Sequence, residues 1–245
     1  MSGIRLLNVT KRFDKSDAPA VDQFSIDVAP GEFVALMGAS GSGKTTLLRM
    51  IAGLEEQDSG DIYLGGKWMN DVPVGQRPVQ MIFQSLALWP HLKVMDQRGY
   101  SNLSFPLKIR RWTPTEIWNR VRGVSQRVGL DEKLYDRRPD ELSGGERQRV
   151  ALARAMVTET KIYLMDEPLS SLDPISRPKM RKEIRRLHDE MHATTLYVTH
   201  SVGDATDMAD RIGCMRDGRL LQIGTYRQLL DAPLEPYITD LLTAS

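Results

Sequence analysis

The sequence predicts an α/β fold with a mainly parallel sheet, and three observations lead to this expectation. Short apolar runs alternate with helical patterns from about residue 30 onward, which is typical of parallel strands joined by crossover helices. Four of these runs are mostly apolar, as expected for strands that are buried on both faces. Polar residues directly follow three of the runs, and ligands of such sheets bind at the carboxyl ends of the strands.

The predicted strands of this sheet are 33–37, 79–83, 162–165 and 196–199. The first leads into a glycine-rich segment. The other three are followed, in order, by Gln84, Asp166 and His200. We therefore expect these three side chains at one edge of the sheet, where a ligand would bind.

A helix is expected at 177–192, and a second layer of strands at the start of the chain. The helix has an apolar stripe that belongs to the core, formed by Met180, Ile184, Leu187 and Met191. The first 30 residues and the segment 60–76 place turn residues between short apolar pieces. This pattern predicts an N-terminal antiparallel β subdomain beside the main sheet.

The strand pattern stops between residues 88 and 141. Within this stretch, 116–128 has the spacing of a helix. We therefore expect an α-helical subdomain at approximately 88–141, inserted within one domain that spans 1–245.

The composition is that of a globular chain. Of the 245 residues, 41% are hydrophobic and 27% charged, which argues against a disordered chain or an integral membrane protein. The net charge of +1 does not draw the chain to nucleic acid or to an anionic bilayer. The start of the chain lacks the pattern of a signal peptide, and no apolar run is long enough to span a membrane, so we expect membrane association only through another protein. The single cysteine, Cys214, is expected to be a small core residue.

The segment 38–45 matches the phosphate-binding motif G-x-x-x-x-G-K-[ST]. Its residues are Gly38, Ala39, Ser40, Gly41, Ser42, Gly43, Lys44 and Thr45. They follow a predicted strand and open a helix that Gly53 could end, which is the context that the motif requires. Backbone N–H groups would surround phosphate oxygens, Lys44 would pair with the β- and γ-phosphates, and Thr45 would bind Mg²⁺. A flexible turn is the alternative, but a chance match in this length is expected about once in a hundred.

Two carboxylates end the predicted strand 162–165. Asp166 suits the coordination shell of Mg²⁺, and Glu167 suits polarising a water molecule for attack. Alone, such a pair is as well explained by a helix or turn cap. Together with the phosphate-binding motif, it predicts a site for nucleotide hydrolysis.

A second anion-binding helix end is predicted after Leu142. Ser143 is a natural N-cap for the helical run 150–156, and Gly144 and Gly145 leave backbone amides free to face an anion. The phosphate-binding motif, this Leu-Ser-Gly-Gly segment and the Asp-Glu-Pro strand end occur here in the order and spacing of an ABC-family nucleotide-binding domain. The chain resembles that family over nearly its whole length.

This resemblance implies a P-loop NTPase core that works as a head-to-tail dimer, with ATP between the P-loop of one subunit and the Ser143 segment of the other. The implied catalytic residues are Glu167, His200 and Lys44, and the implied metal ligands are Thr45, Gln84 and Asp166. The implied ATP-binding residues are Phe13, Gly38, Ala39, Ser40, Gly41, Ser42, Gly43, Lys44, Thr45, Thr46, Gln84, Ser143, Gly144, Gly145, Glu146 and Asp173. Phe13 would stack on adenine; the alternative is a core aromatic that closes the strand before it.

Two positions depart from the family pattern. Position 146 is Glu where Gln is usual, so a negative charge lies in the first turn of the helix that would face ATP. We hypothesise a weakened or more tightly regulated closed dimer, which an unchanged ATPase activity of Glu146→Gln would contradict. Ser201 replaces the Asp that commonly follows the histidine, and the sequence offers no physical account of it.

Segments 83–92 and 199–210 look like those of bacterial importer ATPases. Their implied partners are integral-membrane permease subunits, a second ATPase subunit and an extracytoplasmic substrate-binding protein, with no nucleic acid. The implied location is the cytoplasmic face of the membrane. We expect 86–103, with exposed Leu88, Trp89 and Leu92, to form a docking groove for the permease; an ordinary core of the helical lobe is the alternative.

Other functions remain open. An exporter or lipoprotein-release ATPase is the main alternative, whereas a soluble ABC ATPase acting on DNA or ribosomes would need insertions absent here. A scaffold without catalysis is disfavoured by Lys44, Asp166, Glu167 and His200. Many importer ATPases continue into a regulatory domain; because this sequence ends at Ser245, we expect no such regulation and a better match to shorter relatives.

Overall fold

The computed structural model describes residues 3–14 and 18–243, which form two units. The first unit takes in the described residues up to Met81, then Lys161–Glu167, and those from Ile184 onward. The second unit consists of Ile82–Thr160 and Pro168–Glu183.

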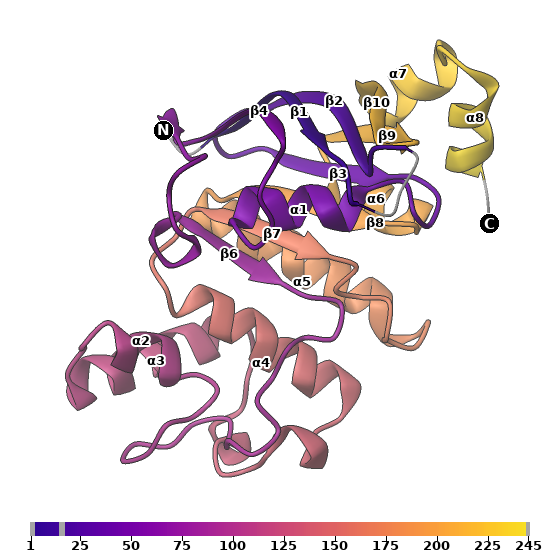
Figure 1. Ribbon diagram of the computed structural model, residues 1–245. Coiled ribbons are helices and arrows are strands. Elements are labelled where there is room, and N and C mark those ends of the chain that lie inside the picture. Colours follow the sequence, from indigo (N-terminus) through magenta and orange to yellow (C-terminus); the bar gives the residue numbers. More distant parts are fainter. Residues whose placement is uncertain (1–2, 15–17, 244–245) are drawn as a thin grey trace. The chain divides into compact units, whose positions relative to one another are not determined.

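A six-stranded sheet forms the centre of the first unit (Figure 1), with strand order β10-β9-β3-β8-β7-β6. Its strands are β3 (Phe33–Met37), β6 (Val79–Ile82), β7 (Ile162–Asp166), β8 (Thr194–Thr199), β9 (Arg211–Arg216) and β10 (Arg219–Gly224). Strand β3 pairs in parallel with β8 and β9, β7 pairs in parallel with β8, and β10 is antiparallel to β9. Every residue of β3, β7 and β8 is buried, which confirms the predicted parallel core.

Strand β8 begins two residues earlier than its apolar run, at Thr194. The hydroxyl of Thr194 accepts a hydrogen bond of 2.9 Å from the backbone N–H of Gly31. The hydroxyl of Thr195 lies 2.9 Å from Nδ1 of the buried His188. Both threonines can be buried because neighbouring segments form hydrogen bonds with their hydroxyls. The hydrophobic pattern of the sequence does not reveal these hydrogen bonds, so it did not predict the first two residues of the strand.

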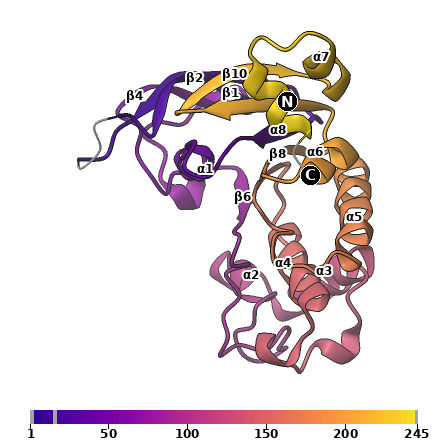
Figure 2. The ribbon, with the colours of Figure 1, turned by 90° about the vertical axis from the view of Figure 1, so that its right-hand side faces the viewer.

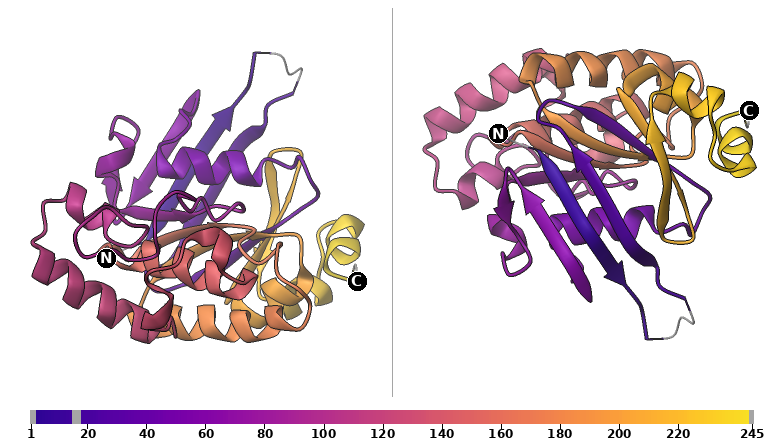
Figure 3. Two further views of the ribbon diagram at one scale, coloured as in Figure 1. Left: turned by 90° about the horizontal axis from the view of Figure 1, so that it is seen from below. Right: turned by 90° about the horizontal axis from the view of Figure 1, so that it is seen from above.

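A second sheet is antiparallel throughout, with the order β2-β1-β4-β5. Its strands are β1 (Ile4–Lys11), β2 (Val21–Val28), β4 (Ser59–Leu64) and β5 (Lys67–Trp68), and Figure 3 shows β1, β2 and β4 side by side. Buried and exposed residues alternate along β2, so one face is covered and the other meets solvent. The predicted N-terminal antiparallel subdomain is confirmed.

Alternate residues of β3 enter two different cores. Val34 and Leu36 belong to a cluster that joins the two sheets to α1 (Lys44–Ala52). Ala35 and Met37 belong to a second cluster on the opposite face, with residues from α6, α7 and α8. The strand that leads into the phosphate-binding motif is therefore held on both faces, as expected for a parallel strand.

The other helices of the first unit lie along these sheets. They are α6 (Val202–Met208), α7 (Tyr226–Asp231) and α8 (Pro236–Thr243), with a short 3₁₀ helix, η1 (Val74–Gln76). Helices α7 and α8 lie together, α7 beside β10 and α8 beside α6 (Figure 2). Helix α5 (Ser176–Met191) runs from the second unit into the first, and Met180, Ile184 and Leu187 of its predicted apolar stripe are buried.

The second unit is mainly helical. It contains α2 (Phe105–Ile109), α3 (Pro114–Arg127), α4 (Gly144–Met156) and two 3₁₀ helices, η2 (Glu132–Leu134) and η3 (Pro139–Glu141). Helix α3 starts two residues before its predicted position because Thr113 and Glu116 form a reciprocal capping box. The predicted lobe at 88–141 falls inside this unit, which extends further on both sides.

None of the helices in residues 3–14 and 18–243 is long and apolar enough to cross a membrane.

Candidate functional site

The segment 38–43 forms the turn between β3 and α1, and neighbouring backbone leaves no room for side chains at two of its glycines. A Cβ on Gly38 would lie 2.2 Å from the carbonyl oxygen of Met215. A Cβ on Gly43, whose φ is +97°, would lie 2.1 Å from the carbonyl oxygen of Ala20. Both distances are impossible for real atoms, so only glycine allows this path of the chain. Helix α1 ends at Gly53 (φ +78°), as predicted.

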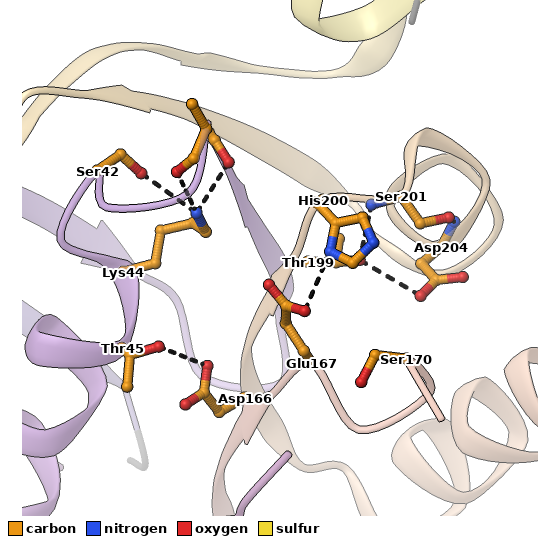
Figure 4. Close-up of polar contacts among 12 residues, drawn as sticks. Ser42, Lys44, Thr45, Asp166, Glu167, Ser170, Thr199, His200, Ser201 and Asp204 are labelled. Carbon is orange, nitrogen blue, oxygen red and sulfur yellow. Dashed lines mark hydrogen bonds and ion pairs between the residues drawn. The ribbon is translucent and has the colours of Figure 1, made fainter. Parts of the chain in front are cut away.

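Lys44 points back into this turn (Figure 4). Its ammonium donates hydrogen bonds to the carbonyl oxygens of Gly38 and Ala39, both at 2.8 Å, and to Oγ of Ser42 at 3.2 Å. Burial lowers the pKa of Lys44, while the charges of Glu167 and Asp166 oppose that effect. A buried cation at the N-terminus of a helix, within a turn of backbone amides, is suited to binding phosphate.

Thr45 and Asp166 bring two oxygen ligands together. The Thr45 hydroxyl donates to Oδ1 of Asp166 at 3.0 Å. Burial raises the pKa of Asp166, and the hydrogen bond from Thr45 works against this rise. In the described part of the chain, no group of three or more His, Cys, Asp or Glu side chains could hold a metal ion. A hydroxyl and one carboxylate fit Mg²⁺, which usually takes few protein ligands and completes its shell with phosphate and water.

Glu167 and His200 form the other half of this edge of the sheet. Nδ1 of His200 lies 3.0 Å from Oε2 of Glu167, and their side chains are 61% and 21% exposed, respectively. Glu167 has a left-handed backbone, with φ of +44°, although it is not glycine. Its N–H donates to the carbonyl of Val198 at 3.0 Å, which helps to hold this conformation. Such strain is concentrated at functional sites, where the surrounding structure maintains it.

The position of His200 depends on residues that sequence reasoning missed. The N–H of Ser201 donates to the Thr199 hydroxyl at 3.0 Å, and the Ser201 hydroxyl caps α6 by accepting from the N–H of Asp204 at 3.3 Å. The buried Asp204 carboxylate accepts from the hydroxyls of Tyr197 at 3.0 Å and Thr199 at 3.3 Å. Ser201 thus has a structural role as an N-cap. The pattern Ser-x-x-Asp before a helix was the signal that could have revealed it.

In the second unit, Ser143 is the N-cap of α4, as predicted. Its hydroxyl accepts from the N–H of Glu146 at 3.3 Å, and the Glu146 carboxylate accepts from the N–H of Ser143 at 2.8 Å. These hydrogen bonds with Ser143 hold the pKa of Glu146 below its ordinary value. The charge at position 146 is therefore engaged at the start of its own helix. Gly144 and Gly145 follow in the first turn of α4.

Asp173 has a similar local role before α5. Its carboxylate accepts from the backbone N–H groups of Ile175 at 3.0 Å and Ser176 at 2.9 Å. Hydrogen bonds from Ser176 lower the pKa of Asp173. These hydrogen bonds orient the carboxylate within its own loop, and a role of Asp173 in binding ATP stays a prediction.

The structure corrects the predicted exposure of Leu88, Trp89 and Leu92. All three are half-buried in the second unit, whereas Gln84 just before them is exposed. The ring centroids of Trp89 and Phe105 lie 4.6 Å apart. Packing against Phe105 covers part of the indole surface that Trp89 would otherwise expose. Packing within the second unit explains the difference.

Arg154 of α4 holds the turn next to these residues. Its guanidinium donates to the carbonyl oxygens of Leu86 at 2.9 Å and Ala87 at 2.6 Å, and it lies 4.9 Å from the centroid of the Trp89 ring. Burial lowers the pKa of Arg154 to about 10. Leu86 and Ala87 both have left-handed backbones, with φ of +59° and +47°. A half-buried cation thus satisfies two carbonyls of a strained turn.

Phe13 is 42% exposed, so the alternative of a core aromatic is wrong. The ammonium of Lys11 lies 5.3 Å from the centroid of its ring. An exposed ring beside a cation leaves room for stacking on a planar base, and adenine stacking at Phe13 stays a prediction.

The predicted site residues divide between the two units. The first unit brings together the 38–46 segment, Asp166, Glu167 and His200 at the carboxyl ends of β3, β7 and β8 (Figure 4), and it also contains Phe13. The residues in the second unit are Gln84, Ser143, Gly144, Gly145, Glu146 and Asp173.

Known sequences are similar to this chain over nearly its whole length. A family model described as "ABC transporter" matches residues 21–170. The chain is 45% identical over 238 residues to the oligosaccharides import ATP-binding protein MsmX of Bacillus subtilis, covering 97% of this chain and 63% of MsmX. It is 46% identical over 248 residues to the trehalose/maltose import ATP-binding protein MalK of Thermococcus litoralis, covering 99% of this chain and 64% of MalK.

The chain therefore spans somewhat less than two thirds of the length of these two relatives. Both are named as import ATP-binding proteins for sugars and both are longer than this chain, so the expected better match to shorter relatives is not seen among them. In a third case, the xylose/arabinose import ATP-binding protein XacJ of Haloferax volcanii is 44% identical over 243 residues, which are 99% of this chain and 61% of XacJ.

Solved structures share the fold. The dimeric structure of the ATP-binding cassette MJ0796 in a post-hydrolysis state with ADP and Pi superimposes with a TM-score of 0.79 and 29% identity, over 91% of this chain and 98% of that one. A second dimeric MJ0796 structure, described as a bacterial ABC transporter cassette, gives the same TM-score at 30% identity over the same shares. With the P-loop, the Asp166–Glu167 strand end and the family match all in place, the chain belongs to the ABC transporter family.

Proposed function

We propose that this chain is the ATP-binding and ATP-hydrolysing subunit of an ABC importer. The observation that carries the proposal is the edge of the six-stranded sheet, where Lys44, the Thr45–Asp166 pair and the Glu167–His200 pair meet. Phosphate binding, metal binding and activation of water need these three groups side by side.

The P-loop and Lys44 bind the phosphates of ATP through backbone N–H groups and one ammonium. Thr45 and Asp166 would hold Mg²⁺, which would supply positive charge against the phosphates of ATP. Gln84 stays a proposed further ligand. Glu167 accepts a proton from the attacking water, and its contact with His200 at 3.0 Å orients the carboxylate. His200 and Lys44 then stabilise the charge that develops on the γ-phosphate.

The second unit supplies the other half of the proposed mechanism. The capped N-terminus of α4, with Ser143, Gly144 and Gly145, would bind the ATP held by the P-loop of a second copy or of a related subunit. Gln84 and the segment 86–103 would connect closure of this dimer to the permease. The half-burial of Leu88, Trp89 and Leu92 supports a preformed docking surface rather than a loose loop.

Import of sugars or oligosaccharides is the transport function that the relatives favour, since MsmX, MalK and XacJ are named for it. The remaining proposed partners are integral-membrane permease subunits and an extracytoplasmic substrate-binding protein, with this subunit peripheral on the cytoplasmic face of the membrane. The exporter alternative has no comparable support among these relatives.

Steady-state ATPase activity of the purified chain, with and without Mg²⁺, tests the proposal. We expect Mg²⁺-dependent turnover that rises more than linearly with protein concentration. Glu167→Gln should lower it roughly 100- to 10,000-fold, the range for loss of a general base. Equal activity of Glu167→Gln and wild type would contradict the assigned role of Glu167.

Glu146→Gln belongs in the same experiment. The capping box can form with Gln as well as Glu, so the variant removes the charge while it keeps the start of α4. Higher turnover in Glu146→Gln would support the hypothesis that the charge of Glu146 weakens the closed dimer. Unchanged turnover would exclude that hypothesis.

A further inference from the structure

The C-terminal helix α8 touches the P-loop through one hydroxyl. The Tyr237 hydroxyl accepts a hydrogen bond of 3.1 Å from the backbone N–H of Ala39. The same hydroxyl lies 3.4 Å from the carbonyl oxygen of Met215, to which it donates. Met215 is also the residue whose carbonyl leaves no space for a side chain at Gly38. Tyr237 therefore bonds both to the loop and to the strand that supports the loop.

Ala39 links this contact to the phosphate-binding lysine. Its carbonyl oxygen accepts from the Lys44 ammonium at 2.8 Å and from the N–H of Ser42 at 3.2 Å. Its N–H is directed to Tyr237 at 3.1 Å. The N–H of Ala39 shares one peptide plane with the carbonyl of Gly38, which also accepts from the Lys44 ammonium at 2.8 Å. Rotation of the Gly38–Ala39 peptide would therefore disturb both the lysine and the helix contact. The hydroxyl of Tyr237 opposes such a rotation because it bonds the N–H of this peptide while Lys44 bonds its carbonyl.

Tyr237 is held in place by its own surroundings. The guanidinium of Arg216 lies 5.1 Å from the centroid of the tyrosine ring and forms an ion pair of 2.7 Å with Glu235. Ile238 and Leu242 of α8 are buried in the cluster that also contains Ala35 and Met37 of β3. The strand before the P-loop and the helix that carries Tyr237 thus share one core. A hydroxyl presented from a packed element can fix a neighbouring loop with precision.

We propose that Tyr237 is a positioning residue for the P-loop, so that the affinity for nucleotide depends on the seating of α8. The inference rests on the proposed ATP site. Tyr237 acts through the Gly38–Ala39 peptide and does not touch phosphate itself. Tyr237 preorganises the loop amides. This raises the affinity for nucleotide because an ordered loop loses less conformational freedom when nucleotide binds.

Tyr237→Phe is the sharpest test, since it removes the hydroxyl and leaves the ring that packs against Arg216. We expect the Kd for ADP in the presence of Mg²⁺, measured by calorimetry, to rise about three- to tenfold, the range for one neutral hydrogen bond. ATP turnover at saturating ATP should change less than twofold. The matched control is Tyr226→Phe, which removes a hydroxyl from an exposed tyrosine of α7 and should leave the Kd unchanged.

Hydrogen exchange of the Ala39 amide, followed by NMR, reports on the contact without any nucleotide. Exchange should be several times faster in Tyr237→Phe than in wild type and unaltered in Tyr226→Phe. If Tyr237 served only to stabilise α8, its loss would raise hydrogen exchange across the whole helix and would not single out the Ala39 amide.

Two outcomes would overturn the inference, and they can be told apart. A wild type that binds ADP, with Tyr237→Phe binding it equally well, would exclude the positioning role and leave the ATP site standing. A wild type that binds no ADP would overturn the proposed function and this inference with it.

Discussion

Two irregular turns, one in each unit, place their backbone in the left-handed region and do so with different residues. The P-loop of the first unit uses Gly41 and Gly43, with φ of +81° and +97°. The turn in the second unit uses Leu86 and Ala87, with φ of +59° and +47°. Glycine adopts such angles at little cost, whereas other residues need support from their surroundings. The left-handed angles of the first turn therefore follow from its residue types, whereas those of the second turn depend on support from other residues.

The two turns also differ in what holds them. Backbone carbonyls of Met215 and Ala20 come so close to Gly38 and Gly43, respectively, that a Cβ at either position would collide with them. The second turn is held by a side chain, the guanidinium of Arg154, which bonds the carbonyls of Leu86 and Ala87. Close backbone approach tolerates no substitution, while a side-chain clamp can be removed by changing one distant residue. Three substitutions test this difference.

Gly43→Ala should have the largest effect. Its Cβ would lie 2.1 Å from the carbonyl of Ala20, and the backbone angle would be strained as well. We expect nucleotide affinity to fall by roughly 100-fold or more, measured as the Kd for ADP with Mg²⁺. The control is Gly75→Ala, where a Cβ meets no atom within 4 Å. Near-normal binding by Gly43→Ala would show that the P-loop can move aside, and the proposed distinction between the turns would be lost.

Arg154→Met should destabilise the second turn. The variant keeps the apolar stem next to Trp89 and removes both hydrogen bonds to the strained carbonyls. We expect the free energy of unfolding in urea to fall by about 2 to 4 kcal/mol. Arg110→Met, at an exposed position after α2, is the matched control and should change it by less than about 0.5 kcal/mol. Equal stabilities of the two variants would mean that Arg154 does not support the turn.

Ala87→Gly should have the smallest effect, and in the opposite direction. Glycine relieves the left-handed strain at this exposed residue but loses more backbone entropy on folding. We expect the free energy of unfolding to stay the same or to rise by up to about 1 kcal/mol in urea titrations. A clear loss of stability would indicate that the methyl group of Ala87 contributes packing that outweighs the strain.

The same distinction explains which parts of the site were predictable. The P-loop, the carboxylate strand end and the Ser143 cap depend on neighbours in sequence, and the structure has each of them as expected. The Ser201 cap was missed although its Ser-x-x-Asp pattern is local, whereas the role of Asp204 depends on the hydroxyls of Tyr197 and Thr199 in β8. The exposure of Trp89 was predicted wrongly because Phe105 and Arg154 cover it, and both are distant in sequence.

Local patterns were enough to identify four strands of the six-stranded sheet, the Ser143 cap and the glycines of the P-loop, since dihedral preferences and runs of buried residues act over a few positions. Strands β9 and β10 were not predicted. Tertiary packing alone decided the contacts between distant segments. These include the Thr45–Asp166 and Glu167–His200 pairs, the clamp of Arg154 on its turn and the hydroxyl of Tyr237 on the P-loop. Hydrogen-bond partners far apart in sequence meet only when the sheet and its helices have packed, and no short pattern in the chain specifies that geometry.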